Sequence, residues 1–132
     1  MAKGKVEKAT NVLIVDDNQS VTSALGKLLE RDGYKVETAC DGETALMIAQ
    51  ESYPDAIILD IDLPGKNGYE IVRTLRKNLY SAALLIALSG YGQAEHKRMA
   101  REAGFDYHLT KPVLVAEIEQ LLNAPRTKVK AG

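Results

Sequence analysis

Short runs of consecutive apolar residues alternate along the chain with longer segments in which apolar residues recur every three or four positions. The short runs are typical of strands that are buried on both faces, whereas the longer spacing is typical of amphipathic helices. Strands are therefore predicted at 12–15, 35–39, 56–60, 84–88 and 105–110, and a helix is predicted after each of them.

The helical segments carry their own start and stop signals. Ser20 or a neighbouring residue is expected to cap the first helix, and Gly33, Pro54 and Gly104 are expected to end the first, second and fourth helices. The helix at 93–103 has few apolar residues, so we expect it to pack loosely. The spacing also predicts inward-facing positions in the first, fourth and last helices: Val21, Leu25, Leu28, Leu29, Met99, Leu114, Ile118, Leu121 and Leu122.

Five strand–helix units in strict alternation predict a parallel sheet with helices on both faces. Five units are too few for a closed eight-stranded barrel. We therefore expect an α/β fold with an open, doubly wound, five-stranded parallel sheet, a (βα)5 arrangement with flavodoxin-like strand order 2-1-3-4-5. The 132 residues fit one domain at 11–123, with a flexible lead at 1–10 and a flexible tail at 124–132.

The net charge, the length of the apolar runs and the cysteine count indicate which partners and which cellular compartment suit the chain. The formal net charge of -1 gives no argument for binding nucleic acid or a membrane surface. No apolar run approaches the roughly 20 residues needed to span a bilayer. The single cysteine, Cys40, excludes a disulfide within the chain, and this favours a cytoplasmic location.

Polar residues with chemical potential follow four of the five predicted strands. Asp16 and Asp17 come after the first strand, Asp60 ends the third, Ser89 follows the fourth and Lys111 follows the fifth. Taken singly, each could be a helix cap, a turn hydroxyl or a solvated lysine. Because the carboxyl ends of parallel strands share one edge of the sheet, we expect all five to converge.

Such a cluster fits a metal ion and phosphoryl transfer. Clustered carboxylates raise one another's pKa unless a cation is present, and an all-oxygen site suits Mg²⁺. A metal beside a carboxylate, an ammonium and a hydroxyl suits a reaction that depends on positioning and charge neutralisation. Asp60 would be the nucleophile and form an aspartyl phosphate, while Lys111 and Ser89 would each contact a phosphoryl oxygen. His96 has no second ligand nearby in the pattern, and we expect it to face solvent.

These residues, in this order, resemble the receiver domain of two-component response regulators over about Asn11–Asn123. The resemblance implies that the protein is a phosphoacceptor and switch rather than an enzyme. Such a domain catalyses only its own phosphorylation and dephosphorylation. Asp60 would take its phosphoryl group from a phosphohistidine on a sensor histidine kinase or a histidine phosphotransfer protein. The matching motifs are Asp16-Asp17, Asp60 followed by Pro64 and Gly68, Ser89-Gly90 and Lys111-Pro112.

The resemblance also implies a set of metal ligands. Asp17 and Asp60 would bind Mg²⁺ directly, and the main-chain carbonyl of Asp62 would be the third protein ligand. Asp16 would act largely through water. The peptide bond before Pro112 is expected to be cis, because bonds preceding proline tolerate that form.

Members of this family relay phosphorylation through a hydroxyl on the fourth strand and an aromatic residue three positions before the lysine. Ser89 fills the first position, and His108 fills the second in place of Tyr or Phe. Because strand side chains alternate between faces, His108 and its neighbour Tyr107 point to opposite sides. We expect His108 to take the switch position, and the partner surface to be the fourth helix, the fifth strand and the fifth helix.

Segments 87–93, 103–105 and 108–113 resemble most closely the receivers attached to hybrid sensor kinases.

Two other classes of protein share parts of this pattern. The pair Asp60 and Asp62 resembles the acid pair of haloacid-dehalogenase-like phosphohydrolases, although there the motif usually opens the fold. A flavodoxin-like FMN carrier would need a phosphate loop rich in small residues after the first strand, where Asp16 and Asp17 would instead repel a phosphate.

Overall fold

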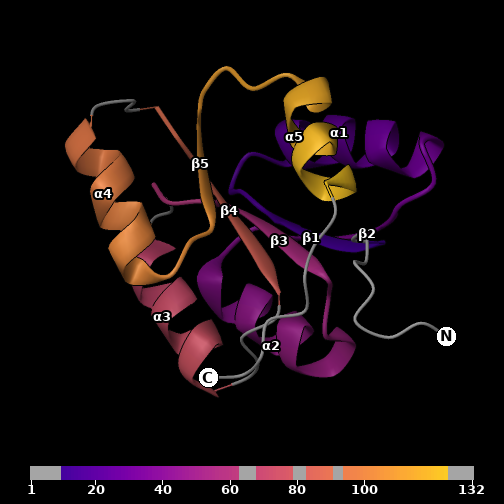
Figure 1. Cartoon of the computed structure of the whole chain (residues 1–132). Coiled ribbons are helices and arrows are strands. Elements are labelled where there is room, and N and C mark those ends of the chain that lie inside the picture. Colours follow the sequence, from indigo (N-terminus) through magenta and orange to yellow (C-terminus); the bar gives the residue numbers. More distant parts are fainter. Residues whose placement is uncertain (1–9, 63–67, 79–82, 91–93, 125–132) are drawn as a thin grey trace, which may run out of the picture.

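In a computed structural model of the chain, residues 10–62, 68–78, 83–90 and 94–124 are described, and they form five strands and five helices in strict alternation (Figure 1). All five predicted strands and all five predicted helices are present, and their ends lie within about two residues of the predicted ones where they can be compared. The elements are β1 (Asn11–Val15), α1 (Gln19–Arg31), β2 (Lys35–Ala39), α2 (Gly42–Ser52), β3 (Ala56–Asp60), α3 (Gly68–Asn78), β4 (Leu84–Ser89), α4 (Ala94–Ala103), β5 (Tyr107–Thr110) and α5 (Val115–Asn123).

The strands form one parallel sheet in the order β2-β1-β3-β4-β5, which confirms the predicted order. In the register, β1 lies between β2 and β3, so that Val12 is opposite both Val36 and Ala56. On the other side of β3, β4 pairs with β5, and Ser89 is opposite Thr110. Because all pairs are parallel, every strand delivers the residue that follows it to the same edge.

Helices cover both faces of this sheet, with α1 and α5 on one side and α2, α3 and α4 on the other (Figure 1). The strand residues alternate between these two layers, as a pleated strand requires. In β1, Val12 and Ile14 pack with Leu29 of α1 and Ile118 of α5. Leu13 and Val15 pack instead into the cluster beneath the other three helices. The sheet is therefore buried on both sides, which explains why its central strands are uninterrupted apolar runs.

Three of the positions predicted to face inward are exposed, and these predictions were wrong. Val21 is 40% exposed and Met99 is 38% exposed, although each lies at a helical spacing shared with buried residues. Val21 lies in the first turn of α1, close to the edge of the sheet rather than over its centre. Leu114 is 67% exposed because it is the N-cap of α5, where the backbone is still extended.

The helix ends are fixed by local hydrogen bonds. Asn18, a neighbour of Ser20, caps α1 by accepting the backbone N–H groups of Ser20 and Val21. Asp41 caps α2 in the same way through Thr44. Gly104 ends α4 with a φ of +125°, a conformation that side chains bearing a Cβ rarely adopt.

The amino-terminal edge of β4 and β5 is tied together by one arginine. The guanidinium of Arg76, at the end of α3, donates to the carbonyl oxygens of Ala83 and Gly104 at 2.9 Å each. It also contacts Asp106 Oδ2 at 2.8 Å, and that oxygen accepts the backbone N–H of Leu85. The edge opposite the polar cluster is thus held by a network that spans three elements.

The expected lead and tail lie outside the described residues except at their inner ends. Thr10, placed in the lead, donates its N–H and hydroxyl to Asp55 Oδ2 at 3.0 and 2.9 Å. The expected loop residues Pro64 and Gly65 also lie outside the described residues. Within the described part of the chain, every helix is too short or too polar to cross a bilayer.

Gly68 allows α3 to begin against the end of β3. A Cβ atom at this position would lie 2.6 Å from Ile61 Cα, a backbone atom that has no room to move. We expect Gly68→Ala to lower the free energy of unfolding by about 1–3 kcal/mol because of this overpacking. Chemical denaturation followed by circular dichroism measures the change.

Gly90→Ala is the matched control. Among the described residues nothing lies within 4 Å of a Cβ placed at Gly90, so the free energy of unfolding should change by no more than about 0.5 kcal/mol. Equal effects of the two substitutions would contradict the close approach of Gly68 to Ile61.

Candidate functional site

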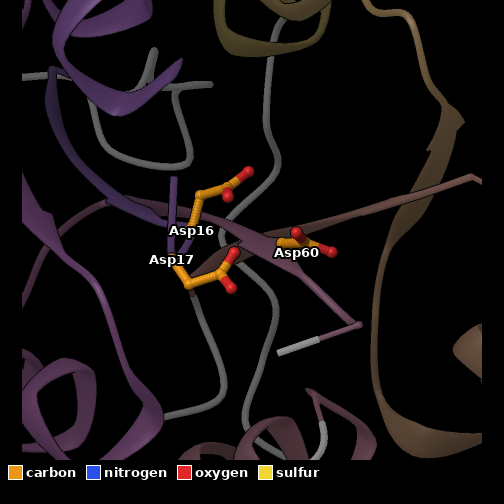
Figure 2. Close-up of side chains that lie close together, drawn as sticks. All are labelled: Asp16, Asp17 and Asp60. Carbon is orange, nitrogen blue, oxygen red and sulfur yellow. The ribbon is translucent and has the colours of Figure 1, made fainter. Parts of the chain in front are cut away.

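Three carboxylates meet at the carboxyl ends of β1 and β3 (Figure 2). Asp16 and Asp17 follow β1, and Asp60 is the last residue of β3. One side-chain oxygen from each lies within 4.8 Å of the others. Asp16 and Asp60 are 3% and 4% exposed, whereas Asp17 faces solvent. We call these three side chains the acidic cup. Two of them, Asp16 and Asp60, are buried, and the third is open to solvent.

Backbone hydrogen bonds hold the two buried carboxylates in place. Oδ1 of Asp16 accepts the N–H of Asn18 at 2.9 Å, and Oδ1 of Asp60 accepts the N–H of Asp62 at the same distance. The second oxygen of each carboxylate remains directed at Lys111, whose ammonium lies 2.9 Å from Asp60 Oδ2 and 4.0 Å from Asp16 Oδ2. The predicted meeting of acids from two segments with the lysine from a third is present in the structure.

Lys111 reaches the site because the pairing of β4 with β5 continues past the strand ends. Its backbone N–H donates to the carbonyl of Ser89 at 2.8 Å. The following peptide bond, to Pro112, is cis. The lysine side chain is 37% exposed, so its ammonium is partly hydrated while it contacts the buried Asp60.

The titration behaviour of the site reflects burial first and the neighbouring charges second. Burial raises the pKa of Asp16, the hydrogen bond from Asn18 opposes this, and the charge of Asp60 raises the pKa further. For Lys111, burial acts to lower the pKa, but the hydrogen bond and the charge of Asp60 outweigh it and leave the pKa raised. The lysine therefore stays charged, and one ammonium balances only part of the negative charge of three acids.

Ser89 and His108 form a second polar pair on the side of the sheet covered by α3 and α4. Ser89 is fully buried at the end of β4, and its Oγ lies 3.0 Å from His108 Nε2. Tyr107, next to His108 on β5, is 44% exposed. His96, expected to face solvent, lies on α4 and is half-buried.

The donor set fits a hard divalent cation. The three carboxylates supply only oxygen atoms, which Mg²⁺ and Ca²⁺ prefer. The charges of Asp60 and Asp17 add to the burial that raises the pKa of Asp16, and a bound cation would offset this repulsion. Asp62 follows the cluster, and its side chain is exposed.

The helical spacing did not reveal a trough that adjoins the acidic cup. A cavity of about 710 Å³ runs between α1 and the segment that joins β5 to α5. It is open to Asp17 and Asp60 at one end, and it is lined by apolar side chains further along. Val21 and Leu28 belong to this lining, which accounts for the exposure of Val21 and for the incomplete burial of Leu28. A helix position that lines a trough has the same sequence spacing as one in the core, so only the three-dimensional arrangement separates them.

An open sheet of order 2-1-3-4-5 with acids and a lysine at its carboxyl edge defines a class of phosphorylation-dependent signalling domain. Residues 12–123 match the model of the response regulator receiver domain, so the chain belongs to this family. The match covers all ten elements. It does not support a haloacid-dehalogenase-like phosphohydrolase, the alternative drawn from Asp60 and Asp62.

Curated relatives are transcriptional regulators. The KDP operon transcriptional regulatory protein KdpE of Escherichia coli is 40% identical over 113 residues, which are 86% of this chain and 49% of that protein. The alkaline phosphatase synthesis transcriptional regulatory protein PhoP of Bacillus subtilis is 37% identical over 113 residues, again 86% of this chain and 47% of that protein. The chain thus spans about half the length of these relatives.

Solved structures agree with this assignment. The chemotaxis response regulator CheY4 of Vibrio cholerae superposes with a TM-score of 0.81 at 32% identity, covering 86% of this chain and 96% of that one. A response regulator protein of Burkholderia pseudomallei, solved with a phosphorylated aspartic acid and a calcium ion, gives a TM-score of 0.81 at 30% identity over 87% of this chain and 67% of that one.

Replacing the most constrained acid should separate stability from metal binding. The pKa of Asp16 is raised from 3.8, so the folded protein binds this proton more tightly than the unfolded chain. Stability is therefore lost as the pH rises from 3.8 through the raised value. Asp16→Asn is expected to increase the melting temperature of the metal-free protein at pH 7 and to weaken Mg²⁺ binding at least about tenfold. Calorimetry with and without MgCl₂ measures both effects.

Asp41→Asn is the matched control, because Asp41 also follows a strand at this edge but accepts a hydrogen bond from its own helix. Asparagine caps helices as well as aspartate does. Mg²⁺ affinity should therefore be unchanged. A loss of metal binding equal to that of Asp16→Asn, or a lower melting temperature for Asp16→Asn, would contradict the account of the acidic cup.

Proposed function

We propose that this receiver accepts a phosphoryl group on Asp60, with Mg²⁺ as the metal ion. The observation that carries the proposal is the 2.9 Å contact between the ammonium of Lys111 and Oδ2 of Asp60, inside a cup that holds two further carboxylates. Asp16 is buried in the same cluster, but its Oδ2 lies 4.0 Å from the ammonium, so Asp60 makes the closer contact with Lys111. The phosphorylated aspartic acid in the Burkholderia pseudomallei relative supports the same class of reaction.

The metal would be held by the side chains of Asp17 and Asp60 and by the main-chain carbonyl of Asp62, with Asp16 acting through water. When bound, Mg²⁺ neutralises negative charge on the transferring phosphoryl group. Lys111 supplies a second positive charge next to Asp60 Oδ2, and it stays protonated because its pKa is raised. The backbone N–H of Asp62 restricts rotation of the Asp60 carboxylate, so that it meets the donor in one orientation.

The phosphoryl transfer exchanges a bond from phosphorus to nitrogen for a bond from phosphorus to oxygen. A carboxylate oxygen of Asp60 forms a bond to phosphorus as the bond between phosphorus and a donor histidine nitrogen breaks, and the freed imidazole takes a proton from solvent. Hydrolysis reverses the state, with water as the acceptor. The receiver contributes positioning and charge to both steps, and so catalyses only its own phosphorylation and dephosphorylation.

The phosphoryl donor is proposed to be a sensor histidine kinase or a histidine phosphotransfer protein in the cytoplasm. Phosphorylation would draw the Ser89 hydroxyl toward the new phosphoryl oxygens and change the surface formed by α4, β5 and α5. Support comes from the location of Ser89 at the end of β4 and of His108 beside it, directly under α4.

The output attached to this switch is a separate proposal. The sequence of segments 87–93, 103–105 and 108–113 favours a receiver of the hybrid-kinase type, which passes phosphate onward or acts through protein contact. The curated relatives are transcriptional regulators, and they favour an output on DNA carried by another part of the protein. Phosphotransfer assays with candidate phosphotransfer proteins distinguish the two outputs.

Asp60→Asn should abolish phosphorylation. An amide is a poor nucleophile and lacks the charge that Lys111 and the metal recognise, so we expect the rate of labelling by radioactive acetyl phosphate with Mg²⁺ to fall at least about a hundredfold. The wild-type protein should reach no more than one phosphoryl group per chain.

Asp62→Asn is the matched control, since it removes a neighbouring exposed carboxylate and retains the main-chain carbonyl and N–H. It should still accept one phosphoryl group. Continuous turnover of a generic phosphomonoester that is lost in Asp62→Asn would instead indicate a phosphohydrolase. Labelling of Asp60→Asn at the wild-type rate would identify another acceptor.

A further inference from the structure

The pair formed by Ser89 and His108 is built into the sheet. His108 is opposite Ala87 in the register of β4 and β5, and Ser89 is two residues beyond Ala87 on the same face. The methyl group of Ala87 leaves space for the ring to reach diagonally to Ser89, and the result is the 3.0 Å contact between Nε2 and Oγ. A Phe ring at position 108 would have no nitrogen with which to make this contact.

The surroundings of the ring favour its neutral form. A pocket of about 200 Å³ under α4 is lined by His108 together with Lys97, Arg101, Asp106 and Tyr107. Burial lowers the pKa of His108, and the charges of Lys97 and His96 lower it further; the polar backbone of His108 itself acts in the other direction but does not outweigh them. Asp106 is the single acid of this lining, and its Oδ2 is already bonded to Arg76 and to the N–H of Leu85.

The two ring nitrogens have different environments. Nε2 faces Ser89, whereas Nδ1 is buried and has no hydrogen-bond partner among the described residues. A buried donor without an acceptor is costly, so the single hydrogen of the neutral ring is better placed on Nε2. In that tautomer the ring donates to Ser89 Oγ, and Ser89 can at the same time donate its own hydrogen to a phosphoryl oxygen.

We propose that His108 is a positioning residue for Ser89: the neutral ring donates to the hydroxyl, so that the two side chains move as one hydrogen-bonded pair when Asp60 is phosphorylated, and protonation of the ring uncouples them. This inference rests on the proposed function. It differs from a switch in which a ring fills space vacated by a hydroxyl, because here the coupling is a hydrogen bond that acid can break.

Protonation of the His108 ring would weaken its pairing with Ser89, because positively charged side chains surround the ring. It would add an N–H at Nδ1, which makes no hydrogen bond to the described residues, and a positive charge facing His96, Lys97 and Arg101. The lining also includes Tyr107, and Asp106 is engaged with Arg76. The charged ring is therefore expected to leave the pocket as the pH falls below its lowered pKa, and the contact between His108 and Ser89 is lost.

The test uses the ¹⁵N-labelled full chain with Mg²⁺ and beryllofluoride, a phosphoryl mimic, at pH 8 and pH 5. The ¹⁹F signal of bound beryllofluoride reports occupancy of Asp60, the ring ¹⁵N signals report the tautomer of His108, and the amide signals of α4 report switching. In the wild type we expect protonated Nε2 and unprotonated Nδ1 at pH 8. At equal ¹⁹F occupancy, the ratio of switched to resting protein should fall about three- to tenfold at the pH where the ring ¹⁵N signals show that His108 is protonated, the equivalent of one net hydrogen bond.

Three variants make the result specific. His108→Gln keeps an amide donor near the position of Nε2 and does not titrate, so its switching should be independent of pH. His108→Phe keeps a ring without the hydrogen bond, and it should show the reduced ratio at both pH values. His96→Gln, on α4, should still lose switching as the pH falls, with a midpoint at a higher pH because a charge that lowers the pKa of His108 is removed.

Equal switching in His108→Phe and the wild type at pH 8 would overturn the inference, as would a hydrogen on Nδ1 in place of Nε2. The same pH dependence in His108→Gln as in the wild type would also overturn it. Absence of a bound ¹⁹F signal in the wild type is a different failure, because it would overturn the proposed acceptor and, with it, the inference that rests on it.

Discussion

The ion pair between Lys111 and Asp60 is the contact on which the site depends. Asp60 is almost fully buried, and a buried carboxylate is costly unless charges and hydrogen bonds compensate for the lost hydration. The ammonium of Lys111 and the N–H of Asp62 supply that compensation. The remaining acids, Asp16 and Asp17, leave the site with excess negative charge. This excess charge favours the binding of a cation and the reaction with an electrophile such as a phosphoryl group.

The fold separates a fixed edge from a responsive one. At the amino-terminal edge of β4 and β5, Arg76 joins α3 to both strands through its contacts with Ala83, Gly104 and Asp106. At the carboxyl edge, Ser89 and Lys111 present polar side-chain atoms with which a new phosphoryl group can interact. A change at Asp60 is therefore expected to be transmitted at one end of α4 while the other end stays anchored.

Much of this arrangement could be predicted from the sequence, because the central strands are buried on both faces. Uninterrupted apolar runs define such strands, and their parallel order places Asp16, Asp60, Ser89 and Lys111 at one edge whatever the details of packing. The sequence could not tell which helix positions line the core and which line a surface trough. Val21 has the spacing of a core residue, yet it borders the cavity beside the acidic cup.

The same limit applies to the pair at the end of β4. Alternation along β5 placed His108 and Tyr107 on opposite faces, but the contact of Nε2 with Ser89 depends on the small side chain of Ala87, and the buried Nδ1 depends on the packing of α4. These are properties of neighbouring strands and helices. They follow from the register and not from the local pattern around residue 108.

The central claim, that Asp60 is the phosphoacceptor, is tested most directly by chemical trapping. Borohydride reduces an aspartyl phosphate to homoserine, and tandem mass spectrometry then locates the modified residue in protein treated with acetyl phosphate and Mg²⁺. The account predicts homoserine at position 60 and at no other aspartate. Homoserine at position 16, 17 or 62, with Asp60 unchanged, would contradict it.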